Sequence, residues 1–231
     1  MAANAPPNDG ELSGAISALQ AFCGPDLTLT IERIEGSLRN ATLDTCAAAL
    51  AACGTKSEVL SAAGLIKRIA GQINVVIHAL GILLCLPRIL QPGEAIEYVS
   101  LGAGNTGRAF DLETNQRIAE FKFIRWQGGP EVIRQNALFK DFYEMAEHAT
   151  KKQRFLYVLG TEYPEKFFNG GRAMSTVLSN ARFRDRFVAK HGEQYQRVRD
   201  YYLPRKHLVA IVDASPFVPE LVEAAIEAED L

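Results

Sequence analysis

Residues 109–124 read Ala-Phe-Asp-Leu-Glu-Thr-Asn-Gln-Arg-Ile-Ala-Glu-Phe-Lys-Phe-Ile, two alternating segments joined by a polar turn. This alternation around a short polar turn predicts a β-hairpin. If Asn115 and Gln116 are the loop residues, Asp111 lies directly opposite Glu120. Directly opposed side chains have Cβ atoms about 4.5–5.5 Å apart, and like charges at that distance are destabilising. The hairpin therefore places two carboxylates together at a cost that calls for a counter-charge.

Lys122 lies on the same face as Glu120, because side chains alternate along a strand. A divalent cation would balance such a group, since Mg²⁺ takes oxygen ligands and typically needs one or two carboxylates from the protein. A nearby amine can orient a metal-bound water or stabilise an anionic transition state. We therefore expect Asp111 and Glu120 to bind Mg²⁺ or Mn²⁺ and Lys122 to act at the attacking water. The alternative is a solvated edge hairpin with a surface Glu–Lys pair.

The spacing Asp111-x8-Glu120-x-Lys122 resembles the PD-(D/E)xK nuclease superfamily, which includes restriction-endonuclease-like and RecB-like nucleases. The resemblance is local and covers roughly residues 70–160. It departs from the superfamily at Phe110, where a proline is frequent. The resemblance implies a metal-dependent nuclease that hydrolyses phosphodiester bonds, with Asp111 and Glu120 as metal ligands and Mg²⁺ or Mn²⁺ as the cofactor.

RecB-like nucleases also carry a Gln-x-x-x-Tyr motif on the helix after the Glu-x-Lys strand. Here Gln135 begins the corresponding stretch, and Phe139 replaces the tyrosine. The resemblance makes Gln135 an auxiliary catalytic residue; the alternative is a glutamine at the edge of the core that bonds to backbone. On the preceding helix, Gln72, Asn74 and His78 are candidates to face the site, although a histidine on an apolar helix is more often a core residue.

The order of the predicted elements indicates an α/β fold. Besides the hairpin, strand patterns cover Leu27–Ile34, Glu94–Leu101, Arg154–Gly160 and Leu208–Asp213, and helical patterns cover Glu11–Phe22, Asn40–Ala52, Ser57–Leu86, a segment starting at Pro130, residues 172–203 and Pro219–Glu229. Pro87 and Pro92 are expected to end the long helix. We expect Ala119, Phe121 and Phe123 to be buried against a helix on the face opposite the carboxylates.

These elements predict a mixed central sheet flanked by helices, compatible with a restriction-endonuclease-like core in which an αβββαβ unit is expected. The domain organisation that we expect is a disordered tail (residues 1–10), a mostly helical N-terminal region (residues 11–56) and a nuclease-like α/β domain (residues 57–231). Tyr98–Gly107 ends in a glycine-rich stretch that resembles the first motif of class I methyltransferases, but too few residues follow it to form the required helix. No GxxxxGK motif is present, which excludes a P-loop.

Composition points to a cytoplasmic protein without a membrane span. The four cysteines (Cys23, Cys46, Cys53 and Cys85) lack metal-binding spacing, which favours free thiols in a reducing compartment. No signal peptide is visible at the N-terminus. The apolar run Ile73–Leu90 is interrupted by Gly81 and Pro87, and a membrane span needs about 20 apolar residues. A buried helix is therefore predicted there.

The net charge of −2 requires any nucleic-acid-binding face to be local. The densest basic segment, residues 182–206, carries eight basic residues against three acids. Its tyrosines, Tyr195, Tyr201 and Tyr202, suit base stacking; the alternative is a solvated helix. The candidate nucleic-acid contacts are Arg125, Arg134, Arg182, Arg184 and Arg186.

Taken together, the residues predict a Mg²⁺-dependent nuclease that acts on nucleic acid, on DNA in preference to RNA, with a homodimer as one option. The first alternative is a catalytically inactive protein of the same fold that binds nucleic acid or a protein partner. An S-adenosylmethionine-dependent methyltransferase is the minor alternative.

Overall fold

The chain divides into two compact units, Met1–Asn74 and Val75–Leu231. The computed structural model describes residues 7–39, 42, 45–46, 56–102, 109–126 and 131–222. The division falls inside the long helix α4 (Ser57–Ile89), whereas the sequence pattern places it between residues 56 and 57. The predicted helix Asn40–Ala52 lies mostly outside the described residues, as does most of the glycine-rich stretch.

The first unit consists of helix α1 (Asp9–Cys23), helix α2 (Leu27–Leu38) and the first part of α4. Helix α1 begins within the predicted N-terminal tail because Asn8 caps it: the Asn8 side chain accepts a hydrogen bond from the Glu11 amide, and Glu11 accepts one from the Asn8 amide. This reciprocal arrangement satisfies two amides that the first turn of a helix leaves unpaired.

The strand predicted at Leu27–Ile34 is wrong, because these residues belong to α2. The alternating, threonine-rich pattern indicates a strand, but local capping favours the helix. The Asp26 carboxylate accepts a hydrogen bond from the Leu29 amide at 3.0 Å, and the Thr30 hydroxyl donates one to the Cys23 carbonyl at 3.0 Å. Side-chain bonds of this kind start a helix at Asp26 whatever the strand propensity of the residues that follow.

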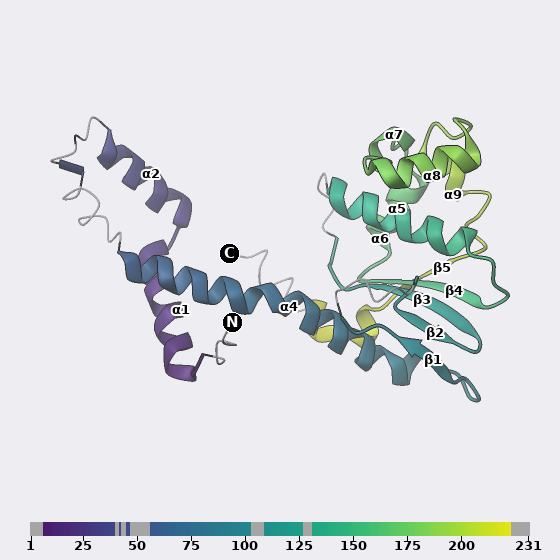
Figure 1. Cartoon of the computed structure of the whole chain (residues 1–231), viewed down its shortest axis with the longest axis horizontal. Coiled ribbons are helices and arrows are strands. Elements are labelled where there is room, and N and C mark those ends of the chain that lie inside the picture. The colour runs from purple at the N-terminus through teal and green to yellow at the C-terminus, as the bar shows by residue number, and fades with distance from the viewer. Residues whose placement is uncertain are drawn as a thin grey trace. The chain divides into compact units, whose positions relative to one another are not determined.

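The second unit contains a five-stranded mixed sheet with the order β1-β2-β3-β4-β5 (Figure 1). The strands are β1 (Ile96–Val99), β2 (Leu112–Thr114), β3 (Arg117–Lys122), β4 (Gln153–Val158) and β5 (Ala210–Asp213). The first three pair antiparallel, whereas β3–β4 and β4–β5 pair parallel. The α/β class with a mixed sheet flanked by helices is therefore as the sequence predicts.

Helices cover both faces of this sheet (Figure 1). After β3 the chain forms α5 (Val132–Glu147), and after β4 it forms α6 (Glu162–Asn169), α7 (Met174–Val177), α8 (Ala181–His191) and α9 (Val198–Tyr202); a short 3-10 helix, Ser215–Phe217, follows β5. Ile118 and Leu156 face the core that α5 to α9 complete. Ala119 and Phe121 face the other core, which α4 supplies with Ile82 and other side chains. The predicted burial of Ala119, Phe121 and Phe123 is thus confirmed.

The helical pattern predicted over residues 172–203 is confirmed in part, since three short helices with non-helical residues between them occupy this segment. Asn180 starts α8 by accepting a hydrogen bond from the Phe183 amide. Gly192 ends α8 with a φ of 60°, which favours glycine because other residues are strained there. By contrast, α4 continues through Pro87 to Ile89, because a proline near the end of a helix breaks few hydrogen bonds.

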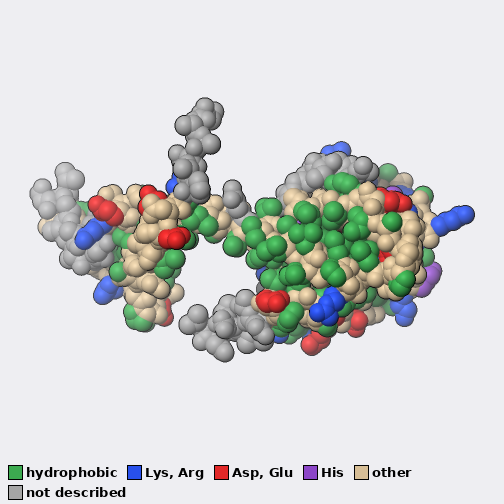
Figure 2. Space-filling model, turned by 90° about the horizontal axis from the view of Figure 1, so that it is seen from below, with side chains coloured by type: hydrophobic (Ala, Val, Ile, Leu, Met, Phe, Trp, Pro, Cys, Tyr) green, Lys and Arg blue, Asp and Glu red, His purple; other side chains and the backbone are tan. Residues whose placement is uncertain are grey.

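The prediction of a buried helix for Ile73–Leu90 is only half correct. Ile82, Cys85 and Ile89 of α4 are buried against the sheet, but Leu80 and Leu84 are more than half exposed. Figure 2 shows hydrophobic side chains gathered on one face of the second unit. Helix α4 is long and apolar enough to cross a membrane, but length and composition are the only criteria, and the core helix of a soluble protein meets them too.

Gly81 provides a test of how closely α4 approaches the sheet. A Cβ atom at Gly81 would lie 2.6 Å from a ring carbon of Phe123, whose ring stacks on Phe121. We expect Gly81→Ala to lower the free energy of unfolding by about 1–3 kcal/mol, measured by urea denaturation, because the ring must move out of a filled core. On the same helix a Cβ at Gly71 would meet nothing within 4 Å, so Gly71→Ala should be neutral or stabilising. Equal effects of the two changes would contradict this packing.

Candidate active site

The β2–β3 hairpin has the register that the sequence predicts. Leu112 pairs with Ala119 and Glu113 with Ile118, so Asp111, one residue before β2, is aligned with Glu120. Asp111 is held there by backbone, because its Oδ2 accepts a hydrogen bond from the Phe121 amide at 2.9 Å. The hairpin thus brings the two predicted carboxylates to the same end of the sheet.

Helix α4 adds a histidine to this group. His78 Nε2 lies 3.3 Å from Asp111 Oδ1, and the two side chains are 22% and 15% exposed. The His78 ring also meets the edge of Phe123, with centroids 6.2 Å apart. Of the three candidates on this helix, His78 faces the site; Asn74 is exposed, and the Gln72 side chain lies outside the described part of the chain.

Lys122 lies between two carboxylates. Its Nζ is 3.0 Å from Glu120 Oε1, which accepts a hydrogen bond, and 2.9 Å from Asp141 Oδ2, which forms an ion pair outside hydrogen-bonding angles. Asp141 belongs to α5, and its side chain is 11% exposed. The surface Glu–Lys pair considered as an alternative does not describe this arrangement, because the Glu120 side chain is only 15% exposed.

Asp141 is the site residue that sequence reasoning missed. It lies in the apolar stripe of α5, between the buried residues Phe139 and Phe142. An acidic residue at the border of such a stripe is a usable signal, because a buried carboxylate needs a partner. The identity of that partner, a lysine on β3, depends on how α5 packs on the sheet and does not follow from spacing along the chain.

The charges at this end of the sheet do not balance. Burial raises the pKa of the Glu120 carboxyl to about 7; the Lys122 ammonium opposes this rise, and the charges of Asp141 and Asp111 add to it. Burial also raises the pKa of Asp141, again against the effect of Lys122. The pKa of Lys122 is itself raised, since its two carboxylate neighbours outweigh the effect of burial. The site therefore has an excess of buried carboxylate.

The residues fit a cation that needs few protein ligands. Within the described residues no group of three or more His, Cys, Asp or Glu side chains lies close enough to hold a metal ion. Mg²⁺ keeps several waters and can be held by one or two carboxylates. Asp111 and Glu120 offer hard oxygen atoms, and the pKa of Glu120 is raised by burial first and by the charges of Asp141 and Asp111 second. These residues are thus compatible with Mg²⁺ or Mn²⁺.

Gln135 lies on α5 with a partly buried side chain whose Oε1 atom, in the described part of the molecule, has no hydrogen-bond partner. The predicted alternative, a glutamine bonded to backbone, therefore does not account for this oxygen. Phe139, which replaces the motif's tyrosine, is fully buried in the core. The Oε1 atom of Gln135 can therefore accept a hydrogen bond from a ligand. Among the described interactions no contact joins Gln135 to Asp111, Glu120 or Lys122.

The predicted nucleic-acid contacts fall into two sets. Arg134 donates a hydrogen bond to the Arg125 carbonyl at 3.1 Å and pairs with Glu131, next to the chain segment between β3 and α5. Arg182, Arg184 and Arg186 are exposed on α8.

Arg182 and Arg186 line an open hollow of about 480 Å³ between α5 and α8, together with Lys140 and Glu144 of α5. Arg186 pairs with Glu144 at 2.7 Å. Two basic side chains of α8 therefore face a surface depression, as a phosphate contact requires.

The predicted base-stacking role of Tyr201 and Tyr202 is wrong. Tyr201 is fully buried and Tyr202 is 8% exposed, so neither ring has a free face. The Tyr201 hydroxyl donates a hydrogen bond to Glu147 at 2.6 Å, and its ring lies under Arg205. These tyrosines complete the core between α5, α8 and α9, because short helices with few apolar residues must bury the rings that they have.

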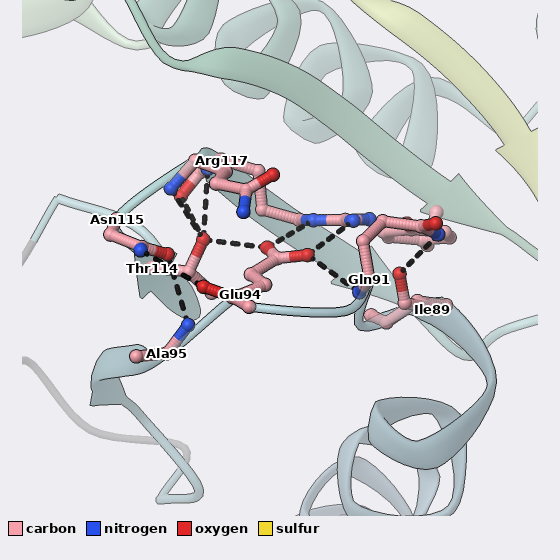
Figure 3. Close-up of polar contacts among 10 residues, drawn as sticks. Ile89, Gln91, Glu94, Ala95, Thr114, Asn115 and Arg117 are labelled. Carbon is pink, nitrogen blue, oxygen red and sulfur yellow. Dashed lines mark hydrogen bonds and ion pairs between the residues drawn. The ribbon is translucent and has the colours of Figure 1, made fainter.

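A second polar cluster lies at the opposite end of β3 and is structural. The Arg117 guanidinium donates two hydrogen bonds of 2.6 Å to the Glu94 carboxylate, and the Thr114 hydroxyl donates a third at 2.6 Å (Figure 3). Arg117 also donates to the Tyr157 hydroxyl at 3.2 Å. Burial alone would raise the pKa of Glu94, but the bonds from Arg117 and Thr114 lower it. Since its members satisfy one another, this cluster is left with no excess charge.

The arrangement of β1 and β2 does not fit the methyltransferase alternative. These strands are antiparallel, whereas a glycine turn of that type joins a strand to a helix within a parallel βαβ unit. The described residues between the glycine stretch and β2, Ala109 to Asp111, are not helical.

Comparisons of the chain with protein-family models, with curated proteins and with solved structures found no match. Its function is therefore inferred from the chemistry of its own residues. The group formed by Asp111, Glu120, Lys122 and Asp141, with His78 beside it, is the strongest basis for that inference.

The raised pKa of Glu120 predicts a pH dependence of stability. The folded state holds a proton on Glu120 up to about pH 7, whereas an ordinary glutamate loses it near pH 4.5. In metal-free buffer the free energy of unfolding of wild type should therefore fall as the pH rises from about 4.5 to about 7. The slope for one proton is at most about 1.4 kcal/mol per pH unit. Glu120→Gln should reduce this decline and be the more stable protein at pH 8, measured by urea denaturation; the part that remains reflects the raised pKa of Asp141. Glu113→Gln on β2 is the control and should keep the wild-type slope.

Proposed function

We propose that this protein is a metal-dependent nuclease of the PD-(D/E)xK type, which hydrolyses phosphodiester bonds of nucleic acid. The observation that carries the proposal is the convergence of Asp111, Glu120 and Lys122 at one end of the sheet, in the register that this motif requires. A chance occurrence of the motif on a surface hairpin would leave its carboxylates exposed, whereas Glu120 is largely buried.

The fold supports the same proposal. The order α4, β1, β2, β3, α5, β4 is the αβββαβ order expected of a restriction-endonuclease-like core. Strands β1 to β3 form an antiparallel meander, and β4 joins β3 in parallel after the crossover through α5. Strand β5 and helices α6 to α9 extend this core. Strand β3 belongs both to the antiparallel hairpin and to the parallel crossover. Side chains of α4 and of α5 therefore both contact the proposed site, His78 through Asp111 and Asp141 through Lys122.

In the proposed reaction Asp111 and Glu120 would hold the cation, and the Lys122 ammonium would orient the attacking water by donating a hydrogen bond to its oxygen. A bound divalent cation would supply an activated water and neutralise phosphate charge. The water oxygen forms a bond to phosphorus and releases one proton to the solvent, the ester P–O bond breaks, and the leaving alkoxide takes up one proton from the solvent. The backbone amide of Phe121 keeps the Asp111 carboxylate oriented by donating a hydrogen bond to its Oδ2 atom.

The hollow between α5 and α8 supports a nucleic-acid substrate. It shares helix α5 with the site, since Lys140 and Glu144 in its wall lie within one turn of Asp141. Arginine and lysine side chains next to a phosphodiester-cleaving site suit the phosphates that flank the scissile bond. Arg182 and Arg186 are the proposed contacts there, with Arg184 exposed on the same helix.

The test of the proposal is cleavage of end-labelled DNA and RNA with Mg²⁺, Mn²⁺ or EDTA. We expect cleavage with either metal and none with EDTA. Asp111→Asn and Lys122→Ala should each lower the rate by about 100-fold or more, because each removes a group that acts in the transition state. Arg88→Ala, a change on α4 outside the site, is the control. Binding without cleavage in wild type would favour the catalytically inactive alternative, and full activity of Lys122→Ala would overturn the assigned role of Lys122.

Replacing Arg182, Arg184 and Arg186 together by glutamine tests the substrate surface. Counterion release makes log affinity fall with log salt by about 0.7–0.9 per phosphate neutralised. We therefore expect weaker binding of DNA and a salt dependence reduced by up to about three phosphate equivalents, measured by fluorescence anisotropy with EDTA present. The fold should persist, because these side chains are exposed. An unchanged slope would move the binding surface to Arg125, Arg134 and Lys140.

A further inference from the structure

Lys122 would compete with a metal ion for the carboxylate of Glu120. Its ammonium lies 3.0 Å from Glu120 Oε1, so it occupies one of the oxygens that a cation would use. Two cations that share one buried carboxylate repel each other, and the loss of either contact leaves a charge without compensation. A lysine whose only anionic partner is a metal ligand would therefore compete with the metal.

Asp141 offers Lys122 a second anionic partner on a different element. Its Oδ2 lies 2.9 Å from Lys122 Nζ, and in the described part of the molecule this oxygen has no hydrogen-bond partner. The position of Asp141 is fixed by its helix, because Leu138, Phe142 and Met145 of α5 are buried in the core. The carboxylate is thus held in place and has spare capacity to accept a stronger bond from Lys122.

Asp141 is not placed as a metal ligand itself. Within the described residues it does not join Asp111 and Glu120 in a group of metal-ligating side chains. The ammonium of Lys122 lies in contact with both Glu120 and Asp141, which puts a positive charge where an ion shared by these two carboxylates would have to sit.

We propose that Asp141 is a positioning residue that holds the ammonium of Lys122 and so frees Glu120 to bind the divalent cation. The inference rests on the proposed metal-dependent function and adds a residue to it. When the cation binds, Lys122 keeps Asp141 as its partner and stays beside the reacting phosphate. Glu120 then serves the metal alone.

The test is isothermal titration of the full chain with Mn²⁺, without nucleic acid, in a set of variants. Asp141→Asn should weaken Mn²⁺ binding by about 10–100-fold, the usual effect of removing a group that supports a ligand, because Lys122 then pairs with Glu120 alone. Lys122→Met should bind Mn²⁺ at least as tightly as wild type. The double variant Asp141→Asn/Lys122→Met should recover the wild-type affinity, because the competitor for Glu120 is gone.

Glu144→Gln is the matched control. It removes the same charge from the same helix, one turn away, but Glu144 pairs with Arg186 and Lys140. Its affinity for Mn²⁺ should stay within about threefold of wild type, since the Glu144 carboxylate is already paired with Arg186 and Lys140 and not with Lys122.

The alternatives give different patterns of affinity. If Asp141 is itself a ligand, the double variant stays as weak as Asp141→Asn, and the inference is overturned. If Asp141 only supports the fold, Asp141→Asn binds Mn²⁺ like wild type and the inference is again overturned. Should Asp141→Asn not fold, the double variant decides, because it removes one charge of each sign and so keeps the net charge of the site: wild-type affinity supports the inference, and weak binding overturns it.

The same titrations separate this inference from the nuclease proposal. If the variants show the expected pattern of Mn²⁺ affinity but wild type cleaves neither DNA nor RNA, the nuclease proposal fails and the role of Asp141 stands. If wild type binds no Mn²⁺ at millimolar concentration, both fail. If wild type cleaves nucleic acid and Asp141→Asn binds Mn²⁺ normally, only the role of Asp141 is overturned.

Discussion

The buried ion pair between Glu94 and Arg117 fixes the start of β3, and the position of the candidate site depends on it. The Glu94 side chain is fully buried and that of Arg117 is 5% exposed, so both charges are removed from water. Such a pair is tolerated only when its geometry is good and its remaining hydrogen-bonding groups are satisfied. Thr114 supplies one of those bonds (Figure 3), and the Tyr157 hydroxyl accepts another from Arg117. Because the pair ties β3 to its neighbours on both sides, β3 cannot slip by a residue, which would turn Glu120 and Lys122 to the other face.

The carboxylates at the two ends of β3 have pKa values shifted in opposite directions. This difference separates the structural cluster around Arg117 from the proposed functional site around Lys122. At the Arg117 end the hydrogen bonds close on themselves and lower the pKa of Glu94. At the Lys122 end burial and neighbouring acids raise the pKa of Glu120 to about 7. Strongly perturbed carboxylates with an incomplete set of partners are typical of sites that bind or react. A cation at that end would relieve the excess of negative charge, which is the physical basis of the proposed function.

Helix α5 connects this site with the proposed substrate surface. Its buried residues pack on the sheet, Asp141 at one border of that stripe reaches Lys122, and Lys140 and Glu144 face the hollow shared with α8. The helix therefore presents a carboxylate to the catalytic group and a lysine to the hollow, a turn or less apart. A rigid element that serves both roles keeps the reacting phosphate and its neighbours in a fixed relation.

The sequence by itself determined the elements whose signals are local. The hairpin register followed from its polar turn and alternating side chains, so Asp111, Glu120 and Lys122 could be brought together from their spacing alone. Local capping residues at Asp26 and Gly192 also lie in the sequence. The alternating pattern of Leu27–Ile34 indicated a strand where Asp26 starts α2, and the helical pattern of residues 172–203 did not indicate that α8 ends at Gly192. Only the tertiary structure decided that Asp141 meets Lys122, that His78 meets Asp111 and that Tyr201 is buried. These contacts join residues on different elements, and their distances depend on how α4, α5 and α9 pack, which no periodicity along one segment encodes.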